Sequence, residues 1–197
     1  MPGCRGVYRF GEGAVGGGGV PQLASFANMV KVEEAAGVAP DAVRRLGALA
    51  VAVVEDAERL WQRLRLKNSE HERLVAIGEG WSRIDPGQGE AAARELIYRH
   101  GPDRYLDRVL VAWARSPAGA ADEAWKNLIS LPQRWTAPTF PLKAKDFIKR
   151  GIEQGPRLGA ALAAAEEAWI AAGFPADRAA LATIADAAVA ATAGEHA

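Results

Sequence analysis

The chain has 197 residues, with 24 Lys/Arg and 24 Asp/Glu, and this length allows one domain or two small helical ones. Its single cysteine, Cys4, excludes an intrachain disulfide, and its three histidines are too far apart in sequence for a typical metal-ligand spacing. No signal-peptide segment is present, and the longest apolar run, residues 46–54, is too short to span a bilayer. We therefore expect a cytoplasmic protein without a membrane partner or a metal site.

The first 20 residues are rich in glycine, with four in succession from Gly16 to Gly19, and predict a flexible lead-in. From Pro21 onward, apolar residues recur at helical spacing between glycine and proline stops. Helices are predicted within residues 21–36, 39–53, 54–66, 67–81, 85–101, 102–116 and 117–132, in a hairpin over 140–174, and over 176–192. No segment sustains the alternation of a strand. The sequence therefore predicts an all-α fold, a bundle-like array of about nine or ten short helices ending in a basic helix-turn-helix hairpin.

The segment 132–141 contains three prolines and predicts the one clearly non-helical connection. It divides the chain into the lead-in (1–20), a helical body (21–131) and a C-terminal hairpin and tail (132–197). Within the body, Ser69 and Glu72 have the spacing of a capping box, and Glu55 is four residues from Arg59, as in a helix-surface ion pair.

Several patterns suggest chemistry but have a structural explanation. Three glycines in "GEGAVG" match G-x-G-x-x-G, but further glycines and then helices follow, where a dinucleotide site needs a βαβ unit. The acidic pairs Glu33-Glu34, Glu55-Asp56 and Glu166-Glu167 are each interpreted as helix-surface charge, because adjacent helical residues point about 100° apart. No nucleophile, acid–base set or metal cluster is recognised, so we predict no catalytic residue.

Positive charge is concentrated in one part of the chain. Residues 126–157 carry seven Lys/Arg and two Asp/Glu, a net charge of +5, whereas residues 1–125 carry −1 and residues 158–197 carry −4. Such a local field can act on a polyanion although the whole chain is neutral.

The hairpin in this basic stretch is the candidate binding site. Gly155-Pro156 starts its second helix, and the first-turn amides of residues 157–159 are expected to be available to an anion. Phe147 and Ile148 are expected to face the core. The candidate phosphate-binding residues are Lys143, Lys145, Lys149, Arg150, Gly155, Arg157 and Gly159. The alternative is an ordinary helical hairpin with solvated lysines, and the residues alone favour neither.

The segment "FPLKAKDFIKRGIEQGPRLGAALAAAEEAWIAAGFP" resembles the C-terminal helical region of bacterial CCA-adding tRNA nucleotidyltransferases, a family shared with bacterial poly(A) polymerases. The matching positions are Pro141, Leu142, Asp146, Ile148, Gly151, Gly155, Pro156, Leu158 and Gly159. The chain departs from the family pattern at Ala144, where the family prefers glycine, and at Phe147, where it prefers leucine. The segments 39–50 and 54–74 resemble the α-proteobacterial version, so the resemblance covers about residues 21–185.

The resemblance implies that the chain is a body-and-tail region that holds the tRNA acceptor stem and elbow, or another structured RNA, through phosphate contacts. The family's catalytic motifs, Gly-Gly-x-ϕ-Arg-Asp (ϕ is apolar) and Asp-x-Asp, do not occur here. Glu55, Asp56 and Arg59 fit the family's nucleotide-reading Glu-Asp-x-x-Arg, but the continuation differs and the segment has the wrong place in the family's order.

Mg²⁺, CTP and ATP would accordingly belong to an absent catalytic head. We predict no cofactor for this chain and no nucleotide transfer by it alone. The alternative is a helical protein-interaction remnant that pairs with a separate nucleotidyltransferase head.

Overall fold

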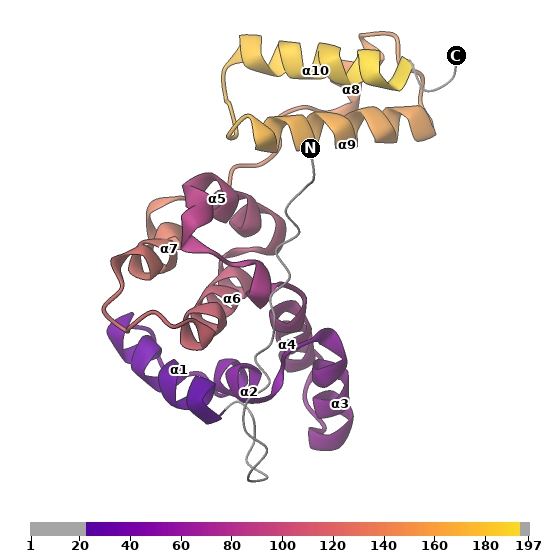
Figure 1. Cartoon of the computed structure of the whole chain (residues 1–197). Helices are drawn as coiled ribbons and strands as arrows, with labels where there is room; N and C mark the ends of the chain where they lie inside the picture. The colour runs from indigo at the N-terminus through magenta and orange to yellow at the C-terminus, as the bar shows by residue number, and fades with distance from the viewer. Residues whose placement is uncertain (1–22, 194–197) are drawn as a thin grey trace, which may run out of the picture.

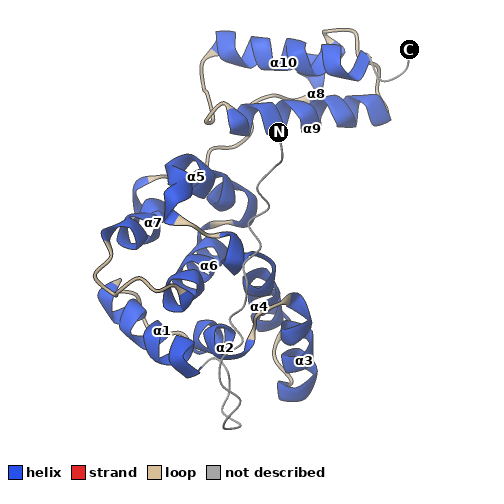
Figure 2. Cartoon of the chain, viewed as in Figure 1, coloured by secondary structure: helices blue, strands red, loops and turns tan. Residues whose placement is uncertain are grey.

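The structure, a computed structural model, describes residues 23–193 (Figure 1). The predicted flexible lead-in, residues 1–20, lies outside them. All regular structure in the described part is helical, which confirms the all-α prediction (Figure 2). The ten α-helices are α1 (Leu23–Ala35), α2 (Ala42–Ala50), α3 (Val54–Leu64), α4 (Asn68–Gly80), α5 (Gly89–His100), α6 (Pro102–Arg115), α7 (Glu123–Arg134), α8 (Ala144–Ile148), α9 (Pro156–Ala171) and α10 (Arg178–Ala193). Two 3₁₀ turns, η1 (Trp81–Arg83) and η2 (Pro86–Gln88), join α4 to α5.

Helix α6 is the centre of the first seven helices and contacts α1, α2, α4, α5 and α7 (Figure 1). Its sequence explains this position, because Tyr105, Val109 and Trp113 recur at intervals of four residues and are all at most 1% exposed. Pro102 begins the helix directly after Gly101, which has a φ of +79°. The large hydrophobic cluster of the protein is therefore built around one helix that is buried on several sides.

A second, smaller hydrophobic cluster lies among α8, α9 and α10. Helices α9 and α10 pack along each other, and α8 contacts both (Figure 1). Alanines at the interface, such as Ala161, Ala165 and Ala185, are fully buried and allow the two long helices to approach closely. Trp169 and Phe147 are the largest fully buried side chains of this cluster.

Aromatic rings connect the two clusters. Tyr98 on α5 lies 5.5 Å from the ring centroids of both Trp169 and Phe174, and Trp135 lies 5.3 Å from Phe174. The Tyr98 hydroxyl donates to Glu166, and Arg99 forms an ion pair of 2.6 Å with Glu167. The acidic pair Glu166-Glu167 therefore fastens α9 to α5.

The non-helical connection begins later than the prolines indicate. Helix α7 continues through Pro132 to Arg134, so the prediction that helix stops at residue 132 was wrong. Pro132 lies in the last turn, where only one intrahelical hydrogen bond is lost. The Trp135 amide donates to the Leu131 carbonyl at 2.9 Å, and the fully buried Leu131 anchors the turn.

Two local pairings predicted from sequence spacing were wrong by one or two residues. The carboxylate that caps the start of α4 is Glu70, which accepts from the Lys67 amide at 2.9 Å, and not Glu72 paired with Ser69. Arg59 pairs with Asp56 rather than with Glu55. The start of α4 lies two residues before the one that the Ser69 spacing implies, which changes the capping carboxylate. α3 begins at Val54 as predicted, and Asp56 faces its first turn because it accepts from the Ala52 and Val53 amides.

The acidic pair Glu33-Glu34 also differs from the prediction of surface charge, because Glu33 is only 1% exposed. Its two carboxylate oxygens pair with Arg44 at 2.9 Å and with Arg45 at 2.8 Å. Arg44 continues the network to Asp107 on α6 at 3.0 Å. This buried network joins α1, α2 and α6, and periodicity could not reveal it because 63 residues separate Arg44 from Asp107.

Candidate nucleic-acid interface

Helix α8, which carries Lys145 and is flanked by Lys143 and Lys149, is kept short by specific contacts at both of its ends. At its start, the Asp146 carboxylate accepts from the Lys143 amide at 2.9 Å. At its end, Gly151 has a φ of +88°, which favours glycine, and its amide donates to Ile148. The Ile152 amide donates to the Phe147 carbonyl at 3.2 Å, which completes a Schellman motif.

The same motif decides which side chains of α8 are buried. Phe147 is fully buried and Ile152 is 2% exposed. This is the hydrophobic contact that commonly accompanies a Schellman motif. Ile148 is 42% exposed, so the prediction that it faces the core was wrong. A helix of five residues has room for only one buried large side chain against α9 and α10.

Four of the five predicted basic residues form what we call the hairpin surface: Lys143, Lys145, Lys149 and Arg157. All four side chains are exposed, three of them on or beside α8 and the fourth in the first turn of α9. The three lysines span seven residues of mostly helical chain, or about 9–10 Å along a helix axis. Within residues 23–193, none of the four takes part in an ion pair.

The fifth predicted basic residue, Arg150, has partners inside the protein. Its Nε atom lies 2.6 Å from Asp186 on α10, and its Nη1 atom donates to the Asp146 carbonyl at 2.8 Å. The structure therefore gives Arg150 a role in joining α8 to α10. Its distance in sequence from Asp186, 36 residues, explains why the charge pattern alone grouped it with the lysines.

The acidic residues that follow the basic stretch in sequence are engaged elsewhere. Glu166 and Glu167 contact Tyr98 and Arg99 on α5, and Asp186 pairs with Arg150. Asp177 accepts from the Ala180 amide at the start of α10. Within residues 158–193, the acidic side chains therefore do not pair with the hairpin surface.

The start of α9 differs from the expectation of available amides. The Leu158 and Gly159 amides both donate to the Gly155 carbonyl, at 3.1 and 3.4 Å. Gly155, with a φ of +147°, is strained for any residue with a side chain. Gly159 is different, because a Cβ atom there would meet no atom within 4 Å. Packing inside the protein therefore does not require glycine at position 159.

A second group of cations lies at the end of α3 and was not predicted as a site. Arg63, Arg65 and Lys67 are exposed, and Trp61, which precedes them, is 36% exposed. Arginines at a helix C-terminus are favoured by the macrodipole alone, so their presence did not indicate a site. The signal that could have identified it is the interleaving of an aromatic residue with cations in "LWQRLRLK".

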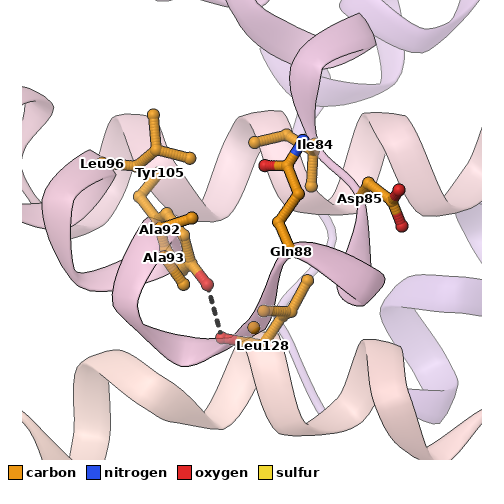
Figure 3. A pocket seen from close by; sticks show the side chains of 9 residues that line it. Ile84, Asp85, Gln88, Ala92, Ala93, Leu96, Tyr105 and Leu128 are labelled. Carbon is orange, nitrogen blue, oxygen red and sulfur yellow. Dashed lines mark hydrogen bonds between the residues drawn. The ribbon is translucent and has the colours of Figure 1, made fainter.

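The space shown in Figure 3 is too small for a small-molecule ligand. The space enclosed by Ile84, Gln88, Leu96, Tyr105 and Leu128 measures about 10 Å³, hardly enough for one water (Figure 3). Its Tyr105 hydroxyl donates to the Leu128 carbonyl at 3.0 Å. No group of three or more potential metal ligands occurs among residues 23–193, and no helix in that range has the length and apolar character needed to cross a bilayer.

In a polar groove between α4 and α6, most charged side chains are paired within the protein. Arg104 pairs with Glu72 at 2.9 Å, and Arg108 donates to the Ala76 carbonyl at 2.6 Å and pairs with Glu79. Burial, aided by the charge of Arg108, lowers the pKa of the neighbouring His100. These contacts account for the groove as part of the packing of α4 on α6.

Comparison with known proteins leaves the family open. No protein-family model matches the chain. The chain is 37% identical over 91 residues to an "Uncharacterized 28 kDa protein in petA 5'region" of Rhodospirillum rubrum. The alignment covers 43% of this chain and 32% of that protein, so the chain spans about a third of the relative's length.

Proposed function

We propose that the chain is the RNA-binding body-and-tail region of a protein related to CCA-adding tRNA nucleotidyltransferases. It acts in the cytoplasm and holds tRNA, or a similarly structured RNA, by its backbone. The sequence resemblance gives the RNA class, and the hairpin surface gives the chemistry, since duplex RNA is bound mainly through shape, 2′-OH and phosphate contacts.

The observation that carries the proposal is the lack of ion pairs at the hairpin surface. Lys143, Lys145, Lys149 and Arg157 gather around one five-residue helix and the start of the next, and none of them forms an ion pair within residues 23–193. The carboxylates of Glu166, Glu167 and Asp186 are engaged with other partners. Exposed cations that form no ion pair within the protein are suited to neutralise RNA phosphates, and this releases the counterions bound to the RNA.

Binding of a tRNA transcript measured from 50 to 300 mM KCl tests this proposal. The affinity should fall with salt, and Lys143→Ala/Lys149→Ala should weaken binding at low salt. The double variant should also reduce the slope of log K against log[salt] by about two, one for each lost phosphate contact.

The matched control is Lys126→Ala/Arg134→Ala. These residues belong to the same basic stretch, but they are paired with Glu123 at 2.9 Å and with Glu90 at 2.9 Å. The control should leave the salt slope almost unchanged. Absence of tRNA binding at 50 mM KCl, or equal slopes for the two double variants, would contradict the proposal.

A second candidate function, docking of a separate catalytic head, is favoured by apolar surface on α1. Leu23, Phe26 and Val30 lie three to four residues apart on this helix and are 56%, 36% and 38% exposed. A groove of about 500 Å³ beside Phe26 is lined by Leu46 and Leu49 of α2. Exposed apolar area of this kind is typical of an interaction site.

Mixing the purified chain with the purified head of a CCA-adding enzyme tests the second candidate. Complex formation on size exclusion, lost in Phe26→Ser/Val30→Ser, would support it, and separate elution would rule it out.

The same mixture can be assayed for Mg²⁺-dependent addition of CMP and AMP to tRNA that lacks its 3′ end. We expect no addition by the chain alone, and clear addition would overturn the non-catalytic assignment.

A further inference from the structure

The exposed end of α3 carries an aromatic ring, and one face of this ring packs against α4. Trp61 stacks on His71 of α4, with ring centroids 4.5 Å apart and an interplanar angle of 14°. The Nε2 atom of His71 lies 2.9 Å from the Glu58 carboxylate, one helical turn before Trp61. Glu58 and His71 thus fix one face of the indole, while Trp61 stays 36% exposed.

Three cations follow Trp61 in sequence, and none of them is paired with an acidic side chain in the described part of the chain. Every residue from Trp61 to Arg65 is exposed, and α3 ends at Arg65, which has a φ of +52°. Lys67 follows, and its amide, not its side chain, is engaged by Glu70. Among the described residues, no ion pair involves Arg63, Arg65 or Lys67. We call Trp61, Arg63, Arg65 and Lys67 the α3 platform.

We propose that the α3 platform binds an unpaired stretch of RNA, with a base stacked on Trp61 and its phosphates next to the cations. An aromatic face combined with basic residues is the arrangement that sequence-tolerant single-strand binders use. Charge complementarity selects a polyanion over a neutral protein surface. This inference rests on the proposed function and deepens it, since it adds a contact to unpaired nucleotides to the duplex contacts of the hairpin surface.

The arrangement of the exposed residues favours RNA over a lipid surface. A helix that lies in a bilayer interface needs a continuous apolar face. The exposed run Trp61–Arg65 is instead mixed, because it contains the polar residues Gln62, Arg63 and Arg65 as well as Trp61 and Leu64, and the indole is stacked on a polar imidazole. α3 packs on α4 at the edge of the body, away from the α8–α10 hairpin (Figure 1). One RNA with paired and unpaired parts would have to extend along the molecule to reach both.

The test compares a blunt RNA duplex with the same duplex carrying a four-nucleotide 3′ overhang, by fluorescence anisotropy with the full chain. The wild type should prefer the overhang about fivefold to a hundredfold, the range that stacking of one base supplies. Trp61→Ala should remove this preference and leave the affinity for blunt duplex unchanged. Trp61→Phe should keep part of it.

Phe26→Ala is the matched control, because Phe26 is also aromatic and 36% exposed but lies on α1. It should leave the preference intact. Should Trp61→Ala lose helical structure by circular dichroism, Arg63→Ala/Lys67→Ala replaces it and should reduce the preference at least threefold. Equal binding of the two RNAs by the wild type, or a preference that survives these substitutions, overturns the inference.

Two further arms separate this inference from its alternatives. Failure of the proposed function would appear as absent binding of the blunt duplex, whereas failure of the platform would appear as blunt-duplex binding without an overhang preference. Vesicles containing phosphatidylserine provide the lipid arm. Vesicle binding that depends on Trp61, without an overhang preference, would assign the platform to a membrane surface and contradict the inference.

Discussion

At the scale of single residues, Gly159 is a position where the fold and the proposed RNA binding have different requirements. Glycine inside a helix is less favourable than alanine by about 1 kcal/mol. At this position the backbone is helical, and an added Cβ would meet no atom within 4 Å. The fold therefore gains nothing from glycine here, while a close approach by a phosphate backbone would.

Gly159→Ala should consequently stabilise the protein and weaken RNA binding. We expect a gain of about 0.4–1 kcal/mol, which raises Tm by roughly 1–4 °C for a chain of this size. Gly151→Ala is the contrasting substitution, because Gly151 has a φ of +88°. This substitution should lower the free energy of unfolding by more than about 1 kcal/mol. Thermal unfolding and tRNA binding measure both effects. A lower Tm for Gly159→Ala would show that the glycine serves the fold.

At the scale of elements, a buried charge network positions α1, α2 and α4 around α6. Asp107 accepts from Arg44 at 3.0 Å and from Arg73 at 2.8 Å, and Arg73 reaches Asp41 at 3.1 Å. Asp107 is 2% exposed and Arg44 is 6% exposed, so little solvent can replace this contact. Arg44 keeps its pair with Glu33, but loss of Asp107 leaves Arg44 and Arg73 with one carboxylate fewer in a buried site.

Asp107→Asn should therefore destabilise the protein by about 3–5 kcal/mol. Glu123→Gln, which removes the exposed pair with Lys126, should cost no more than about 1 kcal/mol. Urea unfolding followed by circular dichroism gives both values. Similar losses for the two variants would mean that solvent reaches Arg44 when Asp107 is replaced.

At the scale of the whole molecule, two aspartates and one histidine make the free energy of unfolding depend on pH in acid. Burial alone would raise the pKa of Asp41, but hydrogen bonds from the Arg44 amide and the Arg73 guanidinium outweigh it and lower the pKa. The pKa of Asp56 is lowered in the same way, since hydrogen bonds from Val53, Ala52 and Arg59 outweigh its burial. The pKa of His100 is also lowered, by burial and by Arg108.

Stability should accordingly fall in two stages as the pH is lowered. The unfolded chain binds a proton at His100 near pH 6.5 while the folded chain does not, so a first decline begins there and ends at the folded pKa. The stability from Asp41 and Asp56 is fully present above about pH 4 and is lost as the pH falls through their lower folded values.

Urea midpoints from pH 8 to pH 3 would resolve the two stages. His100→Gln should flatten the first stage only, and Asp41→Asn should lower stability at pH 7 and shrink the second. A pH profile that neither substitution changes would mean that other groups control acid unfolding.

The helical class, the helices around α6 and the lysines of the hairpin surface could be predicted from the amino-acid sequence. These features depend on neighbours within a few positions, such as the four-residue spacing of Tyr105, Val109 and Trp113 or the glycine that ends α8. Helix ends were predicted less well, as Pro132 and Glu70 illustrate, because a cap depends on the residue at which the helix begins or ends.

Only the tertiary structure decided which charges are used internally and which face outward. It buried Glu33 against Arg44, and it paired Arg150 with Asp186 across 36 residues. It also stacked Trp61 on His71 of α4, and this contact is part of the α3 platform. Spacing along a chain reports which residues share a helical face, whereas burial and ion pairing depend on the helices that pack against that face.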